Sequence, residues 1–324
     1  MESISTLQII TYALFLFSIV AFVMRLARIA RMPVHLRWEL YPLAGEKKRY
    51  WGGSYLEESE WWKKPPEEKS IFKEFRYIIE EILLFKEYFR RKRDYWYLVY
   101  PFHISVFLYV AFLAMLFIGA ISGATGVVVS AETASVWGKI VYYITLLAGG
   151  IGFILGVISS VGLLIRRLTD GQLKPFTRRV DYINLLLVLA VFLTGLLAWV
   201  IFDPAFVASR AYIQGLVTFA PAGSISPTLA LHIMLLLLLM AYIPFTNMMH
   251  FFAKTFTYHS VRWDDRPNLR GSKLERSIGP LLGRPVSWSA SHIQDIKFWS
   301  DTATTVPQEV DAGHQPRVRK GASE

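Results

Sequence analysis

The sequence predicts an all-α integral membrane protein: a bundle of five transmembrane helices, with the N-terminus outside and the C-terminus in the cytoplasm. The chain is 53% hydrophobic and only 19% charged, and its apolar residues gather in five blocks long enough to cross a bilayer. These blocks are residues 7–27, 97–121, 136–165, 182–202 and 228–252. The net charge of +10 is concentrated beside particular block ends, and the positive-inside rule places those ends in the cytoplasm.

Residues 1–30 are expected to form the first transmembrane helix. No basic residue precedes the apolar stretch and no small-residue cleavage site follows it, so it does not have the pattern of a signal peptide. The basic residues that follow place its C-terminal end inside; they are Arg25, Arg28, Arg31 and Arg37.

Residues 31–96 are expected to form a cytoplasmic loop that contains an amphipathic helix. Pro65 and Pro66, followed by two glutamates, favour a helix start. Apolar residues then recur at three- and four-residue spacing, with basic residues between them; they are Ile71, Phe75, Ile78, Ile79, Ile82, Phe85 and Phe89. Such a helix fits the inner membrane surface or the underside of a partner, and the alternative is a solvated helix packed on its own loop.

Residues 97–252 are predicted to form a four-helix membrane core, which holds the candidate ligand residues described below. The loop at 166–179 is rich in Lys and Arg and is expected inside, while the loop at 122–135 has neither residue and is expected outside. The loop after residue 202 carries one basic residue, Arg210. Residues 253–324 are expected to form a cytoplasmic tail. The tail begins near Trp263. Its Trp288 and Trp299 are unusual for a disordered segment and suggest that this part of the tail docks on another surface. The last 20 or so residues have the composition of a disordered segment.

Composition also excludes several classes of chemistry. The chain has no cysteine, which rules out disulfides, thiolate-held iron–sulfur clusters and thioether-linked haem within it. Any such cluster must belong to a partner. Apart from Lys139 at an outer edge, no Lys, Asp or Glu sits deep in the five blocks, which argues against an ion or proton transporter. The excess of basic residues is explained by membrane topology and lipid contact, and not by nucleic-acid binding.

Two histidines in the last block carry the strongest chemical signal. His232 and His250 are 18 residues apart, which is five full helical turns and ~27 Å along one face. Ionisable residues inside a membrane are costly and are functional candidates by default. A neutral imidazole is also a common metal ligand. The spacing therefore indicates a helix that holds haem iron at one or both membrane faces.

His103 supplies the expected partner for His250. It lies about two turns from the cytoplasmic end of the second block, at the depth of His250, so both are predicted to ligate one haem b. Two imidazoles give a six-coordinate iron suited to electron transfer. The alternative is that each makes an interhelical hydrogen bond. His232 has no histidine at its level. It would hold a second haem whose other ligand is not a histidine or comes from another subunit, or it would hydrogen-bond to a neighbour or a quinone head group. Met115 is one candidate for that ligand, and ordinary packing is its alternative role.

The third block is rich in glycine, and Gly152 and Gly156 form a small-xxx-small pattern. Such patterns let helix backbones approach closely. Making room for a flat porphyrin is a second reading, and the two are compatible.

These residues together resemble the nitrate reductase gamma-subunit family. The resemblance is carried by Phe102-His103-Ile104, Ala148-Gly149-Gly150, Arg166-Arg167-Leu168, Asp181 and His232 with Pro244-Phe245 and His250. It implies a five-helix b-type cytochrome, N-terminus outside, that oxidises quinol and feeds cytoplasmic iron–sulfur subunits. The family carries a second histidine ten residues after the first, where this chain has Leu113. The pair of His103 and His250, expected near the cytoplasmic face, therefore matches the family pattern. At the outer face, only His232 does.

The long first loop and the tail, with Trp263-Asp264-Asp265 and Ser287-Trp288-Ser289-Ala290-Ser291-His292, are similar to one branch of that family. This branch includes the membrane subunit of heterodisulfide reductase and the DsrM subunit of the sulfite-reduction-associated complex. The resemblance implies a multi-pass subunit of a respiratory complex in the cell membrane, serving sulfite or sulfate reduction. It would exchange electrons between menaquinol or menaquinone and a cytoplasmic, heterodisulfide-reductase-like iron–sulfur subunit, alongside further membrane and extracytoplasmic redox subunits.

Lys139 is the predicted quinone contact at the outer edge, because an ammonium can hydrogen-bond a quinone carbonyl. An interfacial lysine that reaches the lipid head groups is the alternative. Two other functions stay open. One is a haem-free membrane anchor or assembly subunit, and the other is the cytochrome b of a hydrogenase or formate dehydrogenase complex.

Overall fold

The computed structural model describes residues 4–31, 71–253, 270–271, 273–286 and 298–304. Five of its helices are long and apolar enough to cross a membrane, which confirms the multi-pass prediction. They are α1 (Thr6–Ala30), α4 (Arg93–Ala124), α5 (Val136–Thr169), α6 (Arg179–Leu197) with the π-helical turn η3 (Ala198–Phe202), and α8 (Pro227–Tyr242) with the 3-10 turn η4 (Ile243–Phe245). Which end of each helix faces the cytoplasm stays a prediction.

The chain divides into two compact units. Residues 1–27 with 70–253 form the first, and residues 28–69 with 254–324 form the second. In the second unit, α10 (Lys273–Leu282) is followed by α11 (Trp299–Thr304), and the amide of Trp299 donates to the carbonyl of Arg284. Several predicted features lie outside the described residues: the helix start at Pro65, the tail motif at Trp263 and the C-terminal residues 305–324.

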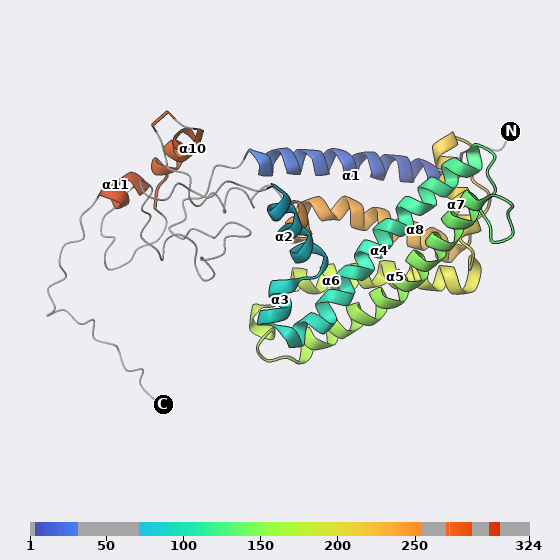
Figure 1. Ribbon diagram of the computed structural model, residues 1–324, viewed down its shortest axis with the longest axis horizontal. Coiled ribbons are helices and arrows are strands. Elements are labelled where there is room, and N and C mark those ends of the chain that lie inside the picture. The colour runs from blue at the N-terminus through green and yellow to red at the C-terminus, as the bar shows by residue number, and fades with distance from the viewer. Residues whose placement is uncertain (1–3, 32–70, 254–269, 272, 287–297, 305–324) are drawn as a thin grey trace. The chain divides into compact units, whose positions relative to one another are not determined.

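The first unit is built on an α4–α5 pair, with α6 beside α5 and α8 beside α6 (Figure 1). Glycines on α5 make this close approach possible. A methyl group at Gly149 would lie 2.8 Å from the ring of Phe112, and one at Gly156 would lie 2.4 Å from the ring of Phe192. Predicted close packing at these glycines is therefore confirmed, and the neighbours are aromatic rings.

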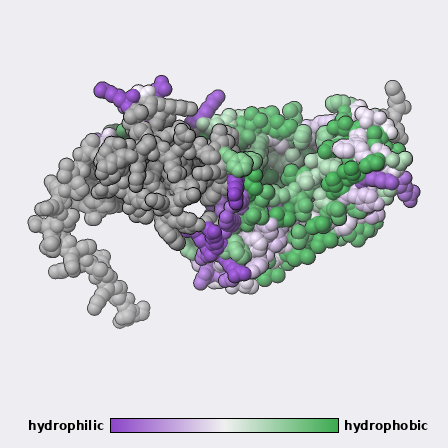
Figure 2. Space-filling model, viewed as in Figure 1, coloured by the Kyte–Doolittle hydropathy of each residue, from purple (hydrophilic) through white to green (hydrophobic). Residues whose placement is uncertain are grey.

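The face of this unit that Figure 2 shows is largely apolar between its two ends. Leu147 and Ile158 are 59% and 64% exposed, as expected for side chains that face lipid. The buried hydroxyl of Thr145 bonds within its own helix: it donates to the carbonyl of Val141 at 2.6 Å. Such an internal bond satisfies a polar group where no water is available.

The last predicted block is not one continuous helix. The α-helix α8 ends at Tyr242, and the chain passes through η4 and η5 (Asn247–Met249) before it reaches His250. Pro244 lacks an amide hydrogen and is incompatible with the α-helical bond at its position. Counting five uniform turns from His232 to His250 is therefore wrong, because 3-10 turns are tighter than α-helical ones.

The loop after η3 contains a helix that the sequence analysis missed, α7 (Val207–Thr218). Its start is capped by Asp203, whose carboxylate accepts from the amides of Ala208 and Ser209 at 3.1 and 2.8 Å. Arg210 is buried, and donates from Nη1 and Nη2 to the carbonyls of Val129 and Ala205. Arg210, expected in a loop, therefore lies in α7 and ties this helix to the segment after α4.

The predicted amphipathic helix is present but broken. It forms α2 (Ile71–Leu83) and α3 (Lys86–Arg91), separated at Phe85, whose φ of 49° lies in the left-handed region. Phe72 and Phe75 are 77% and 60% exposed on the apolar face of α2. Hydrogen bonds from Lys86 and Arg76 lower the pKa of Glu80, so this carboxylate joins α2 to α3.

Candidate functional site

The structure brings His103 and His250 together. His103 is in the first third of α4 and His250 directly follows η5. Their ring centroids are 6.3 Å apart, and their ring planes are inclined by 79°. The two residues are 147 positions apart in the chain, so the fold, and not local sequence, creates the pair.

Each imidazole is held through its Nδ1 atom by a backbone carbonyl. His103 Nδ1 donates to Val99 O at 2.7 Å, and His250 Nδ1 donates to Asn247 O at 3.2 Å. A carbonyl only accepts, so Nδ1 carries the proton and the lone pair lies on Nε2. Metal-binding histidines commonly have this second-shell arrangement, because it sets the tautomer and the ring orientation.

The separation of the rings fits a shared iron. A metal–imidazole bond is about 2 Å long and the ring centroid lies about 1 Å further back, so rings on opposite sides of one ion have centroids about 6 Å apart. Within the described part of the chain, no three His, Asp or Glu residues gather as a metal site. Two protein ligands alone suit a haem iron, since the porphyrin supplies the other four.

Aromatic side chains surround His103. The Phe85 ring lies 4.7 Å from that of His103, and Phe102 lies 5.4 Å from it. Trp96 and Tyr100 stack at 4.3 Å beside them. The left-handed backbone at Phe85 directs the chain between α2 and α3 so that this ring reaches His103. Sequence spacing placed Phe85 on an amphipathic face and gave no signal of this contact.

A polar chain holds the turn that carries His250. Asn184 of α6 donates to the side-chain oxygen of Asn247 at 3.0 Å, and Asn247 in turn reaches Asp181 at 3.4 Å. Asp181 also caps the start of α6 by accepting from the amide of Arg178. The start of α6 thus positions η5, and the carbonyl of Asn247 orients His250.

His232 is in a different environment. It is only 5% exposed; its Nδ1 donates to Val191 O at 3.0 Å, and its Nε2 accepts from the hydroxyl of Tyr109 at 3.0 Å. Both ring nitrogens are thus engaged by neighbouring helices, as in the interhelical hydrogen-bond alternative. Tyr109 was missed by the sequence analysis, although a buried tyrosine in an apolar helix requires such a partner.

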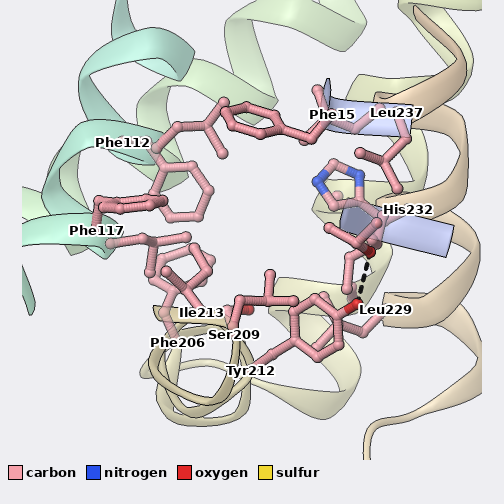
Figure 3. Close-up of a pocket in the computed structure, with 18 of the residues that line it drawn as sticks. Phe15, Phe112, Phe117, Phe206, Ser209, Tyr212, Ile213, Leu229, His232 and Leu237 are labelled. Atoms are coloured by element: carbon pink, nitrogen blue, oxygen red, sulfur yellow. Dashed lines mark hydrogen bonds between the residues drawn. The ribbon is translucent and has the colours of Figure 1, made fainter. Parts of the chain in front are cut away.

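A cavity of about 360 Å³ lies beside His232 (Figure 3). His232, Leu229 and Leu237 form one wall, and Phe112 lies across the cavity from them. Leu113 lines it, whereas Met115 does not, so Met115 does not share a site with His232. Lys139 is exposed in the first turn of α5 and is not part of the lining.

Comparison with known proteins gives one match. The family model described as the nitrate reductase gamma subunit matches residues 99–264, about half of the 324-residue chain. The match covers His103, His232 and His250. No curated protein and no solved structure matches the chain.

Proposed function

The chain belongs to the nitrate reductase gamma subunit family and is a membrane cytochrome b subunit that transfers electrons within a multi-subunit redox complex. From this premise we propose that it exchanges electrons between a menaquinone-type pool and a cytoplasmic iron–sulfur subunit of heterodisulfide-reductase type, in sulfite or sulfate reduction. The observation that carries the proposal is the His103–His250 pair, with each Nδ1 bonded to a carbonyl.

His103 and His250 are the residues that would hold the haem iron. Bound there, a b-type haem would supply reversible one-electron transfer. The residues around it position the ligands: Val99 and Asn247 set the tautomers, and the ring of Phe85 packs against that of His103. We propose one haem per chain, held by this pair, because both ring nitrogens of His232 are already hydrogen-bonded to Val191 and Tyr109.

The visible spectrum of the purified chain tests the ligands. His103→Ala and His250→Ala should each abolish the low-spin signal, because each removes an axial imidazole. His35→Ala, in the long loop, is the matched control and should leave the spectrum unchanged. A double variant that keeps a full bis-imidazole spectrum would exclude this site. A wild-type chain without a Soret band would favour the haem-free anchor.

The proposed quinone contact is Lys139, at the end of the bundle where α5 begins. Lys139→Ala should slow reduction by a menaquinol analogue and leave the spectrum unchanged. An outer quinone needs an electron acceptor nearby, and the engaged nitrogens of His232 argue against a second haem there. Unchanged reduction kinetics would indicate that the quinone site lies instead on the side of the membrane where His103 and His250 lie.

The cytoplasmic loop and the tail at 262–299 are the proposed dock for the iron–sulfur subunit, because they are rich in Trp, Tyr and Arg. Truncation at Arg262 should retain the haem and release the partner. A partner that still co-purifies in full amount with the truncated chain would rule out the tail. Identification of that partner by mass spectrometry also separates this proposal from a hydrogenase or formate dehydrogenase complex.

A further inference from the structure

The cavity beside His232 has an entrance on the membrane-spanning surface. Two of its lining side chains, Phe15 of α1 and Phe117 of α4, are 44% and 47% exposed, while Leu229 and Leu237 on the far wall are each only 4% exposed. Both α1 and α4 are membrane-spanning helices. The cavity therefore opens between them, at a level where lipid chains surround the protein.

The hydrogen-bond donors that line the cavity are already used within the protein. Tyr212 and Thr11 bond at 2.8 Å, and Thr11 also donates to the carbonyl of Leu7. Ser209 donates to Asp203, Tyr12 to the carbonyl of Leu216, and Trp199 to the carbonyl of Pro204. His232 donates to Val191.

A ligand with a polar head would find few partners here. A quinone carbonyl needs a donor, and these are engaged. A haem iron needs an axial ligand, and the lone pair of His232 Nε2 accepts from Tyr109. Water is also a poor occupant, because a buried water requires several polar partners. An empty space of about 360 Å³ would leave the lining atoms without contacts.

We propose that this cavity binds an acyl chain of a membrane phospholipid, which enters between Phe15 and Phe117 and packs against Leu229 and Leu237. Its head group stays at the membrane surface, and the chain fills the half of the bundle that lies away from His103 and His250. This site does not depend on the proposed haem ligands, so either proposal can fail without the other.

Photolabelling in nanodiscs tests the proposal. The full chain is reconstituted with a phosphatidylglycerol that carries a diazirine on one acyl chain, irradiated, and mapped by mass spectrometry. Label is expected on the buried cavity residues Leu229 and Leu237, as well as on Leu231 and Leu238, which are 51% and 53% exposed to lipid on the same helix. Label confined to the exposed pair would overturn the proposal.

Cavity-filling variants provide the matched control. Leu236→Trp places a large ring in the cavity and should reduce label on Leu229 and Leu237 severalfold. Leu238→Trp adds the same ring to the lipid-facing side of α8 and should leave that label unchanged. An independent pair on α4, Leu113→Trp and Val110→Trp, should behave in the same way, so misfolding of one variant does not decide the result. Equal labelling of Leu229 and Leu237 in the filled and control variants would count against the cavity.

Competition with menaquinone or with haem distinguishes the acyl chain from the other ligands that could occupy the cavity. Excess menaquinone that removes label from Leu229 and Leu237, while label on Leu231 and Leu238 persists, would assign the cavity to a quinone tail and overturn the acyl chain. Haem-supplemented expression that yields two haems per chain and loses the same label would assign it to a second haem. Cavity label that survives both treatments supports the phospholipid.

Discussion

At the scale of single residues, the proposed haem ligands were predictable and their surroundings were not. His103 and His250 stand out because ionisable residues are rare in membrane helices. Their tautomers depend on backbone carbonyls, and the Phe85 contact depends on a left-handed residue between α2 and α3. Neither leaves a pattern in the sequence. The engagement of His232 by Tyr109 was likewise hidden, because the two residues meet only through tertiary packing.

Asn247 should act as a positioning residue for His250. Asn247→Ala keeps the backbone carbonyl that His250 uses but removes the side-chain bonds to Asn184 and Asp181. Loss of second-shell support commonly lowers metal affinity about 10- to 100-fold. We therefore expect weaker haem retention and an altered midpoint potential, measured by haem titration and redox potentiometry. Phe245→Leu, at a side chain 68% exposed in the same segment, is the control. Equal haem affinity in wild type and Asn247→Ala would show that η5 holds its shape unaided.

Asp170 should make the α4–α5 contact pH-dependent. Its carboxylate accepts hydrogen bonds from the amide of Gln172 and from the hydroxyl of Tyr95, and these bonds hold the pKa of Asp170 below its usual range. A lowered folded-state pKa stabilises the fold above the unfolded-state pKa, and this contribution is lost as the pH falls through the folded-state value. Asp170→Asn should therefore melt below wild type at about pH 7, and the difference should shrink at about pH 3. Thermal unfolding in detergent measures it, and a pH-independent difference would exclude this cause.

At the scale of elements, hydrophobic blocks predict the helices that cross the membrane, but not their irregular ends. The five blocks match the five spans, because length and apolar composition decide both. Pro244 lacks the amide hydrogen that a continuous helix needs, but only the structure shows that α8 ends at Tyr242 and that 3-10 turns carry His250. The helix α7 was missed because its apolar residues are too few for a span, and its position rests on the tertiary contacts of Arg210.

Gly156 should be among the least replaceable residues of α5. A methyl group at this position would lie 2.4 Å from the Phe192 ring, closer than atoms approach without a shift of α6. Overpacking of a well-filled core costs about 1–3 kcal/mol, so Gly156→Ala should lower the melting temperature in detergent. Gly171→Ala, where a methyl group meets no atom within 4 Å, is the control. Equal melting temperatures would mean that α5 and α6 separate easily.

At the scale of the whole molecule, the predicted topology follows from where the basic residues lie, and this can be tested cleanly because the chain has no cysteine. Arg166, Arg167 and Lys174 flank the loop after α5, whereas the loop after α4 has no Lys or Arg, so the positive-inside rule places these loops on opposite sides. Ala131 and Gly171 are exposed in the two loops. In intact cells, or in spheroplasts if an outer membrane blocks access, a membrane-impermeant maleimide should label Ala131→Cys. It should label Gly171→Cys only after permeabilisation. The reverse pattern would invert the bundle and place His103 and His250 on the outer side, where a cytoplasmic iron–sulfur partner could not reach them.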